Sequence, residues 1–178
     1  HAVVETQKRY GRIDILVNNA ARNIPKPVWE MPTDTWRFIV DICLTSQFFF
    51  IRAALPRMIE RKSGCIINIS SGAAWVPFKW GDSAYSAAKA GVLALTRAVA
   101  AEVGPHNIRV NAIAPDLIWN DHLAKIYPPE YFDDLKKMSV TGKTGRPEDM
   151  ARIALFLATD TYLTGQVING SGGIYMHP

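Results

Sequence analysis

The sequence predicts an α/β fold in which a parallel β-sheet carries helices on both faces. Short apolar runs rich in β-branched residues alternate with longer helical segments along the chain, which is the order that parallel strands and their crossover helices require. Glycine and proline separate the successive segments. We therefore expect one domain built from right-handed strand–helix–strand units.

Four segments are expected to form the strands of this sheet. Each is short, apolar and followed by polar or turn-forming residues, which is typical of a strand buried on both faces. They are Ile13–Val17, Cys65–Ile69, Ile108–Ile113 and Gln166–Asn169.

The intervening segments are expected to be helical, and most carry start or stop signals. Gly11 closes the first helix, Thr33 or Asp34 can cap the second, Pro56 is expected to bend it, and Gly104-Pro105 ends the third. The helices are expected at Ala2–Tyr10, Thr35–Arg61, Ser83–Val103 and Pro147–Ala158, and Asp121–Met138 is expected to be irregular or helical with a break at Pro128-Pro129.

Composition narrows the classes of protein to consider. With 178 residues, 48% of them hydrophobic and 20% charged, the chain can bury one sizeable core, so residues 1–178 are expected to form a single domain. Cys43 and Cys65 lie far apart in the sequence, with no histidine near either, so no disulfide framework and no metal site is expected. A reducing, cytoplasmic setting follows from this cysteine usage.

Charge and hydropathy argue against nucleic-acid and membrane partners. The net charge is +4, but basic residues occur singly or in pairs such as Arg61-Lys62, and they form no basic stripe. The longest uninterrupted apolar runs are shorter than the roughly 20 residues that a membrane span needs, and no signal peptide is visible. The chain begins at His1 within a predicted helix, so we expect a domain truncated at its N-terminus.

Small or polar residues follow three of the predicted strands. Asn18-Asn19-Ala20-Ala21 comes after the first, Ser70-Ser71-Gly72 after the second and Ala114-Pro115-Asp116 after the third. In open α/β sheets, ligands bind outside the carboxyl ends of the strands. The three segments are therefore expected to line one binding site.

Tyr85 and Lys89 form the most informative pair in the chain. They lie four residues apart near the start of a predicted helix, hence on one face and within reach of each other. An adjacent ammonium and the positive end of a helix dipole would both lower the pKa of a phenol, making Tyr85 a usable general acid/base. The alternative is a boundary tyrosine beside a solvated lysine on an amphipathic helix.

Several segments together resemble the classical short-chain dehydrogenase/reductase family, including its 3-oxoacyl reductase and sugar-alcohol dehydrogenase members. The resemblance covers essentially the whole chain and implies a Rossmann-like doubly wound parallel sheet, present here from the family's fourth strand onward. The matching segments are Asn18-Asn19-Ala20-Ala21, Ile66-Ile67-Asn68-Ile69-Ser70-Ser71, Tyr85-Ser86-Ala87-Ala88-Lys89, Asn107 to Pro115, Gly145-Arg146-Pro147-Glu148 and Leu163-Thr164-Gly165-Gln166.

The resemblance implies an NAD(P)-dependent oxidoreductase that interconverts a ketone and a secondary alcohol. Tyr85 would be the general acid/base, Lys89 would lower its pKa and hold the nicotinamide ribose, and Ser71 would orient the substrate oxygen. As an alternative, Ser70 or Ser71 would merely satisfy a strand end. The remaining cofactor contacts, with NAD or NADP, would come from Asn18, Ala20, Pro115, Leu117 and Ile118.

Four features depart from the family pattern. The Gly-rich phosphate turn that opens the family's fold does not occur in these residues, which predicts weak dinucleotide binding and an exposed apolar sheet edge. Cys43 replaces an asparagine that supports a proton relay, Asp116 replaces the glycine of a Pro-Gly pair, and the interval from Ser71 to Tyr85 is one residue longer than usual. A non-catalytic relative that binds a nucleotide or partner is therefore the alternative function.

Aromatic residues gather in the segments expected over the substrate, where they favour an apolar or ring-bearing carbonyl or alcohol, or else fill a core or subunit contact. These residues are Trp75, Phe78, Trp80, Trp119, Tyr127 and Tyr131. The apolar helix Ser83–Val103 and the tract Met150–Leu157 are candidates for packing between subunits. By resemblance, a homo-oligomer is expected, either a tetramer or a dimer.

Overall fold

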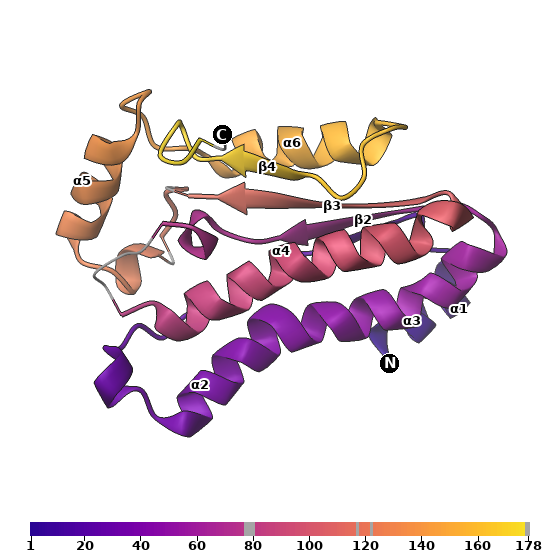
Figure 1. Ribbon diagram of the computed structural model, residues 1–178, viewed down its shortest axis with the longest axis horizontal. Coiled ribbons are helices and arrows are strands. Elements are labelled where there is room, and N and C mark those ends of the chain that lie inside the picture. The colour runs from indigo at the N-terminus through magenta and orange to yellow at the C-terminus, as the bar shows by residue number, and fades with distance from the viewer. Residues whose placement is uncertain (77–80, 117, 122, 177–178) are drawn as a thin grey trace.

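Four parallel strands, in the order β1-β2-β3-β4, form the sheet at the centre of the molecule (Figure 1). The computed structural model describes residues 1–76, 81–116, 118–121 and 123–176. The strands are β1 (Ile15–Asn18), β2 (Gly64–Ile69), β3 (Ile108–Pro115) and β4 (Val167–Gly170). All four predicted strands are present, although β1 starts two residues later than expected and β3 continues to Pro115, where it pairs with Gly170.

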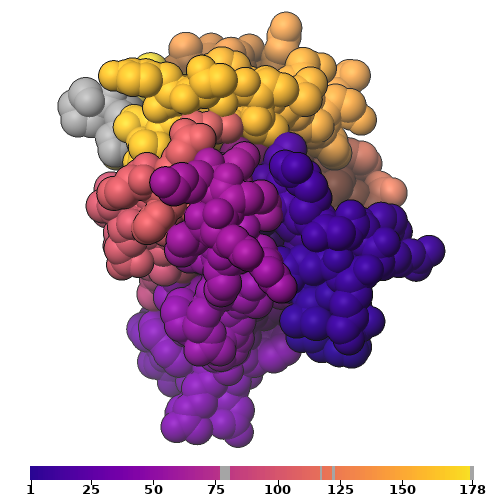
Figure 2. All heavy atoms as spheres, turned by 90° about the vertical axis from the view of Figure 1, so that its right-hand side faces the viewer, coloured from indigo at the N-terminus to yellow at the C-terminus, as the bar shows by residue number. Residues whose placement is uncertain are grey.

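One face of the sheet is covered by α1 (Ala2–Tyr10), α3 (Ser46–Glu60) and α4 (Ser83–Val103). Ile66 of β2 and Val110 of β3 point into this layer and are fully buried against helical residues such as Ala54 and Val99. Seen from the end of the molecule that forms the right-hand side of Figure 1, the indigo N-terminal segment lies beside purple α3 (Figure 2). This layer holds the larger part of the core.

The other face of the sheet packs against α6 (Pro147–Thr159). Ile67 and Ile113 alternate with the residues of the first face and meet Leu157 of this helix. The strand order continues in one direction while the covering helix changes sides, so the connection from β3 to β4 has the opposite hand to the two before it (Figure 1). The expectation that all crossovers are right-handed is therefore wrong.

Two family landmark residues tie this second layer together. The Arg109 guanidinium donates to the carbonyls of Leu157 and Ala158 at the end of α6, at 2.8 and 3.2 Å. The Asn111 amide donates to the Leu163 carbonyl at 2.8 Å. Cations and donors at a helix C-terminus satisfy carbonyls that have no partner within the helix, so these side chains fix the approach to β4.

The predicted second helix is interrupted, but not at the proline. It consists of α2 (Thr33–Val40), a π-helical turn (Asp41–Thr45) and α3, and Pro56 lies inside α3. Its N-cap is Pro32, and neither Thr33 nor Asp34 caps it with a side-chain hydrogen bond. Short π-helical turns bend helices and often lie at functional sites. The turn carries Cys43.

The stretch Thr33–Glu60 is long and apolar enough to cross a membrane by length and composition. In this fold it is one layer of the α/β arrangement, because Ile51, Ala54 and Met58 pack into the core. The core helix of a globular domain meets the same criteria of length and hydropathy.

The β1 edge of the sheet is apolar and exposed. β1 pairs only with β2 among the described strands, and its Ile15 and Val17 side chains are 46% and 47% exposed. This agrees with the expected apolar edge. Helix α5 (Pro129–Met138) begins directly after Pro128, as the predicted break requires. It lies beside the carboxyl ends of the strands (Figure 1).

Candidate active site

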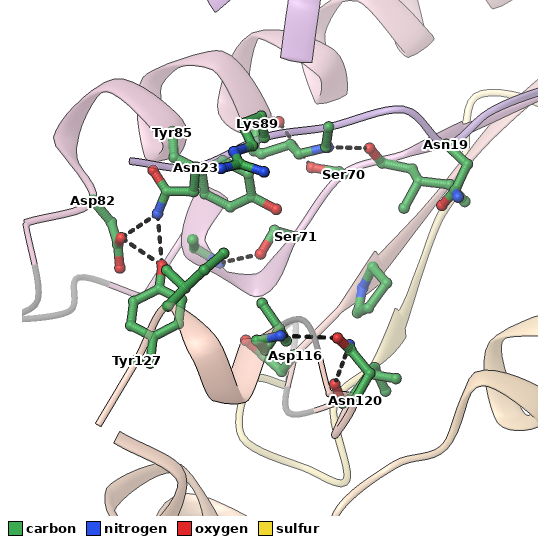
Figure 3. Close-up of a pocket in the computed structure, with 18 of the residues that line it drawn as sticks. Asn19, Asn23, Ser70, Ser71, Asp82, Tyr85, Lys89, Asp116, Asn120 and Tyr127 are labelled. Atoms are coloured by element: carbon green, nitrogen blue, oxygen red, sulfur yellow. Dashed lines mark hydrogen bonds between the residues drawn. The ribbon is translucent and has the colours of Figure 1, made fainter. Parts of the chain in front are cut away.

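A cavity of about 230 Å³ lies at the carboxyl ends of the strands, where the sequence places the site (Figure 3). All three predicted strand exits contribute to it. Its lining also includes the start of α4 and the segment that leads to α5. The lining includes Asn19, Arg22, Asn23, Ser71, Asp82, Tyr85, Lys89, Pro115, Asp116, Ile118, Asn120, Tyr127 and Tyr131.

Lys89 is buried, and its position is set by the backbone of β2. Its Nζ donates to the Ile69 carbonyl at 2.7 Å, and the Ser70 hydroxyl donates to the Lys89 carbonyl at 2.8 Å. These two bonds clamp the strand end to α4. Nζ also lies 5.4 Å from the centre of the Tyr85 ring, so the predicted pair does share one face of the helix.

The charges in this pair do not follow the sequence-based expectation. Burial lowers the pKa of Lys89 to about 8. Burial raises the pKa of Tyr85, and the neighbouring Cys43, Asp82 and Asp116 raise it further, against a hydrogen bond with Ser71 that lowers it. The expected lowering of the Tyr85 pKa is therefore contradicted in this cavity, whereas the effect of Lys89 on it stays a prediction. Tyr85 is a protonated phenol at neutral pH.

The two serines after β2 have separate roles in the fold. Ser70 is 2% exposed and satisfies the Lys89 carbonyl, which is the structural role considered for a strand-end serine. Ser71 is half-buried, lines the cavity and caps a short turn by accepting a bond from the Ala73 N–H at 3.2 Å. Its hydroxyl is the one that meets Tyr85.

Asn18 lies inside the sheet rather than in the cavity lining. Its amide donates to Asn68 Oδ1 at 2.9 Å, and the Asn68 amide donates to the Thr96 hydroxyl at 3.0 Å. This buried chain joins β1, β2 and α4, so Asn18 braces the sheet, and its expected contact with the cofactor stays a prediction. Ala20 is exposed outside the lining, whereas the adjacent Asn19 lines the cavity.

The segment after β3 forms one side of the cavity. Pro115 and Ile118 line it, and Ile118 is held in place by a parallel bridge to Gly145. Leu117, the third residue expected there, lies outside the described residues. Pro115 and Ile118 therefore both line the cavity, and their contact with a cofactor stays a prediction.

Asp116 fills space that Gly72 leaves open. A Cβ at position 72 would lie 2.1 Å from both Asp116 carboxylate oxygens, so the carboxylate packs directly over the glycine. Burial raises the pKa of Asp116 to about 7, and its Oδ2 is buried without a hydrogen-bond partner among the described residues. The absence of a side chain at Gly72 thus makes room for the Asp116 carboxylate.

Sequence reasoning missed a buried polar cluster beside the start of α4. Asn23 Nδ2 donates to Asp82 Oδ1 at 2.5 Å and to the Tyr127 hydroxyl at 2.6 Å, and Tyr127 donates to Asp82 Oδ1 at 2.9 Å (Figure 3). Burial raises the pKa of Asp82. These residues are far apart in the chain and form no short motif, so no local signal predicts the cluster.

Only some of the aromatic residues expected over the substrate line the cavity. Tyr127 and Tyr131 line it and stack with their ring centres 4.0 Å apart. Trp75 instead stacks on Tyr175 at 4.7 Å, and Trp119 is 50% exposed outside the lining. Phe78 and Trp80 lie outside the described residues.

Cys43 is fully buried in the π-helical turn, and its Sγ contacts the Arg22 carbonyl at 3.2 Å. Gln47, one turn further on, donates to the Cys43 carbonyl at 3.1 Å and to the Ile69 carbonyl at 3.3 Å. Lys89 uses the same Ile69 carbonyl. Gln47 and Lys89 therefore share one acceptor at the end of β2, and the spacing of Gln47 from Cys43 on one helix is the signal that could have identified it.

Known proteins that are similar to this chain over nearly its whole length are reductases. A family profile described as enoyl-(acyl carrier protein) reductase matches residues 1–175. The chain is 38% identical to the 3-oxoacyl-[acyl-carrier-protein] reductase of Chlamydia pneumoniae, over 93% of this chain and 67% of that protein. It is 39% identical to a hydroxy-methyl-oxo-hexahydroindene-carboxyl-CoA reductase of Mycobacterium tuberculosis, over 93% of this chain and 64% of that protein.

Solved structures agree with these sequence matches. The 3-oxoacyl-[acyl-carrier protein] reductase of Brucella melitensis with bound NAD superposes with a TM-score of 0.89 at 35% identity, covering 98% of this chain and 67% of that one. ElxO with bound NADP superposes with a TM-score of 0.89 at 29% identity, covering 97% and 71%. The chain belongs to the short-chain dehydrogenase/reductase family of oxidoreductases.

Proposed function

We propose that this chain carries the acid/base half of an NAD(P)-dependent enzyme that interconverts a ketone and a secondary alcohol. The observation that supports this most directly is the meeting of Ser71, Tyr85 and Lys89 at one cavity. Tyr85 is the general acid/base, and Ser71 orients the substrate oxygen. Lys89 holds the nicotinamide ribose hydroxyls.

The protonation state of Tyr85 favours the reductive direction near neutral pH. In reduction, the phenol gives its proton to the carbonyl oxygen while the carbonyl carbon receives hydride, and a secondary alcohol forms. Oxidation needs the tyrosinate, which the raised pKa of Tyr85 makes scarce. We therefore expect oxidation to rise with pH over a range in which reduction does not.

The residues present fit the nicotinamide half of a dinucleotide. The ammonium of Lys89 and the hydroxyl of Tyr85 line one cavity and match the paired hydroxyls of a ribose, and Pro115 and Ile118 offer backbone beside them. Asn19 is the polar residue at the β1 end of the lining, and it replaces Ala20 as our candidate for cofactor contact on that side. When bound, NAD or NADP supplies or accepts the hydride.

The test is a spectroscopic assay of nicotinamide oxidation and reduction with a panel of ketones and alcohols. Because the 178 residues contain no Gly-rich phosphate turn, the assay uses a version extended at its N-terminus with such a segment. We expect turnover that Tyr85→Phe lowers by about 100-fold or more. Tyr162→Phe, at an exposed tyrosine, is the matched control. Undiminished turnover in Tyr85→Phe would refute the assignment.

The non-catalytic alternative is the weaker proposal. Cys43 and Asp116 motivated it, yet Ser71, Tyr85 and Lys89 all remain at the cavity. Binding of NAD or NADP to the extended protein, with no turnover across the whole panel, would favour this alternative.

We further propose a cytoplasmic homo-oligomer, either a tetramer or a dimer, without nucleic-acid or membrane partners. The supporting observation is the apolar surface of the helical layers, where Phe48, Phe49 and Phe50 of α3 and Leu155 and Phe156 of α6 are 40–64% exposed. Patches of this kind mark interaction surfaces. Light scattering on the extended protein would show a mass of one subunit if the proposal fails.

A further inference from the structure

Two side chains donate to one backbone carbonyl at the end of β2. The Ile69 carbonyl accepts from the Lys89 ammonium at 2.7 Å and from the Gln47 amide at 3.3 Å. Both side chains are only 1% exposed. Ile69 lies beyond the register of β1, which ends with Asn18 opposite Asn68. A carbonyl oxygen has two lone pairs and can accept both bonds, although one donor is enough to satisfy it.

The orientation of the Gln47 amide follows from its neighbours. Its Nε2 lies 3.1 Å from the Cys43 carbonyl and 3.3 Å from the Ile69 carbonyl, and carbonyls can only accept. The nitrogen must therefore face them, while Oε1 faces away and has no hydrogen-bond partner among the described residues. Gln47 is thus fixed as a donor to Ile69, from the first turn of α3 directly after the π-helical turn.

Lys89 differs from Gln47 because its side chain lines the cavity. Its Nζ lies 5.4 Å from the centre of the Tyr85 ring, whereas Gln47 is not in the lining. No ion pair between described residues includes Lys89, so the bond to Ile69 is what holds Nζ in place. Any movement of Nζ into the cavity lengthens this bond, and the carbonyl then depends on its second donor.

We propose that Gln47 is a positioning residue for Lys89, whose amide keeps the Ile69 carbonyl satisfied while the ammonium turns toward the nicotinamide ribose hydroxyls. This rests on the proposed function, because it concerns how Lys89 acts in the same site. Without the Gln47 amide, the same movement leaves a buried carbonyl without a donor, and this cost lowers the affinity for the cofactor.

The first test is an unfolding cycle that needs neither cofactor nor turnover. Gln47→Met and Lys89→Met, made in the N-terminally extended protein, each leave one donor on the Ile69 carbonyl, and the double variant leaves none. We expect the urea midpoint of the double variant to fall by about 0.5–1 M more than the sum of the two single shifts. Additive shifts would overturn the proposal, because the two donors would then not replace each other.

A matched cycle controls for general effects of these substitutions. Gln166 is exposed, and its amide donates to the Thr164 carbonyl at 3.2 Å. Gln166→Met combined with Lys89→Met should give additive shifts of the urea midpoint.

The second test is a titration of the extended protein with NADH or NADPH, followed by fluorescence. We expect Gln47→Met to raise the Kd of the cofactor about tenfold and to leave kcat within about threefold of the parent. Its urea midpoint should stay close to that of the parent, because Lys89 still satisfies Ile69 and the unpaired Oε1 is removed together with the amide. An unchanged Kd would overturn the proposal, and this comparison needs only the single variant.

A purely structural role for Gln47 predicts a different pattern. In that case Gln47→Met alone would lower the urea midpoint as much as the double variant does, or would fail to fold, and either result refutes the proposal. If the parent bound neither NADH nor NADPH, the proposed function would fail and this role with it. An additive unfolding cycle together with normal cofactor binding would refute only the role of Gln47.

Discussion

The two walls of the cavity hold their polar groups in different ways. On the wall of β2 and α4, Ser70 and Lys89 are bound to backbone carbonyls within one strand–helix unit. In the second wall, Asn23, Asp82 and Tyr127 are bound to one another from segments that are far apart in the chain, and Asp82 is the N-cap of α4. The first wall depends on the fold alone, whereas the second depends on side chains that other sequences can replace without changing the fold. Chemistry is therefore expected to reside in the first wall and selectivity in the second.

The largest expected effect is on the first wall. Lys89→Met should lower kcat by about 100-fold or more, because it removes the proposed partner of the nicotinamide ribose and the positive charge beside Tyr85. The free energy of unfolding should change by only about 1 kcal/mol, since the loss of a desolvated ammonium offsets the lost bond to Ile69.

The measurement pairs steady-state kinetics with urea unfolding. Lys125→Met, at an exposed lysine near the cavity, serves as the matched control and should alter neither quantity. A kcat within tenfold of the parent would mean that this wall does not carry the chemistry.

The next effect concerns the coupling within the second wall. Asp82→Asn and Tyr127→Phe should each lower the free energy of unfolding by about 1–2 kcal/mol, because each leaves buried polar atoms without a partner. The double variant should lose less than the sum, with a coupling of about 1 kcal/mol. Urea unfolding of all four proteins measures it.

A second cycle controls for indirect effects. Asp82→Asn combined with Tyr162→Phe, an exposed tyrosine, should give additive losses. If the losses in free energy of unfolding of Asp82→Asn and Tyr127→Phe were also additive, the cluster would not act as a unit.

The unpartnered carboxyl of Asp116 predicts a pH dependence of stability. Its folded-state pKa is raised to about 7, above the ordinary value of 3.8, so between these values the folded protein binds more protons than the unfolded chain. Its contribution therefore falls as pH rises from about 4 to 7. At pH 8, Asp116→Asn should have a free energy of unfolding about 1–2 kcal/mol above that of the parent and should unfold at a higher temperature. The difference should be smaller at pH 5.

Thermal unfolding of the two proteins across this range checks the sign. Asp133→Asn, at an exposed carboxyl, should show no such pH-dependent difference. A difference that grows toward pH 5 would contradict the assignment of a buried, unpartnered carboxyl at position 116.

The contrast between the walls also explains what the sequence could predict. Strand exits, helix Ser83–Val103 and the Tyr85–Lys89 pair are local patterns, and the structure reproduces their positions. The cluster of Asn23, Asp82 and Tyr127 depends on three loops meeting, which no spacing encodes. The expected lowering of the Tyr85 pKa fails for a related reason, because burial raises this pKa and Cys43, Asp82 and Asp116 raise it further.

The smallest expected effect lies behind the first wall, at Cys43. By family resemblance an asparagine here supports a proton relay, so Cys43→Asn should raise kcat severalfold. A larger polar side chain in a fully buried position should also lower the free energy of unfolding by about 1 kcal/mol. The two quantities thus move in opposite directions, which separates a relay from a general change in packing. Cys65→Ala, at the other buried cysteine, should lower stability and leave kcat unchanged. An unchanged kcat in Cys43→Asn would show that protons reach Lys89 by a route that does not involve the π-helical turn.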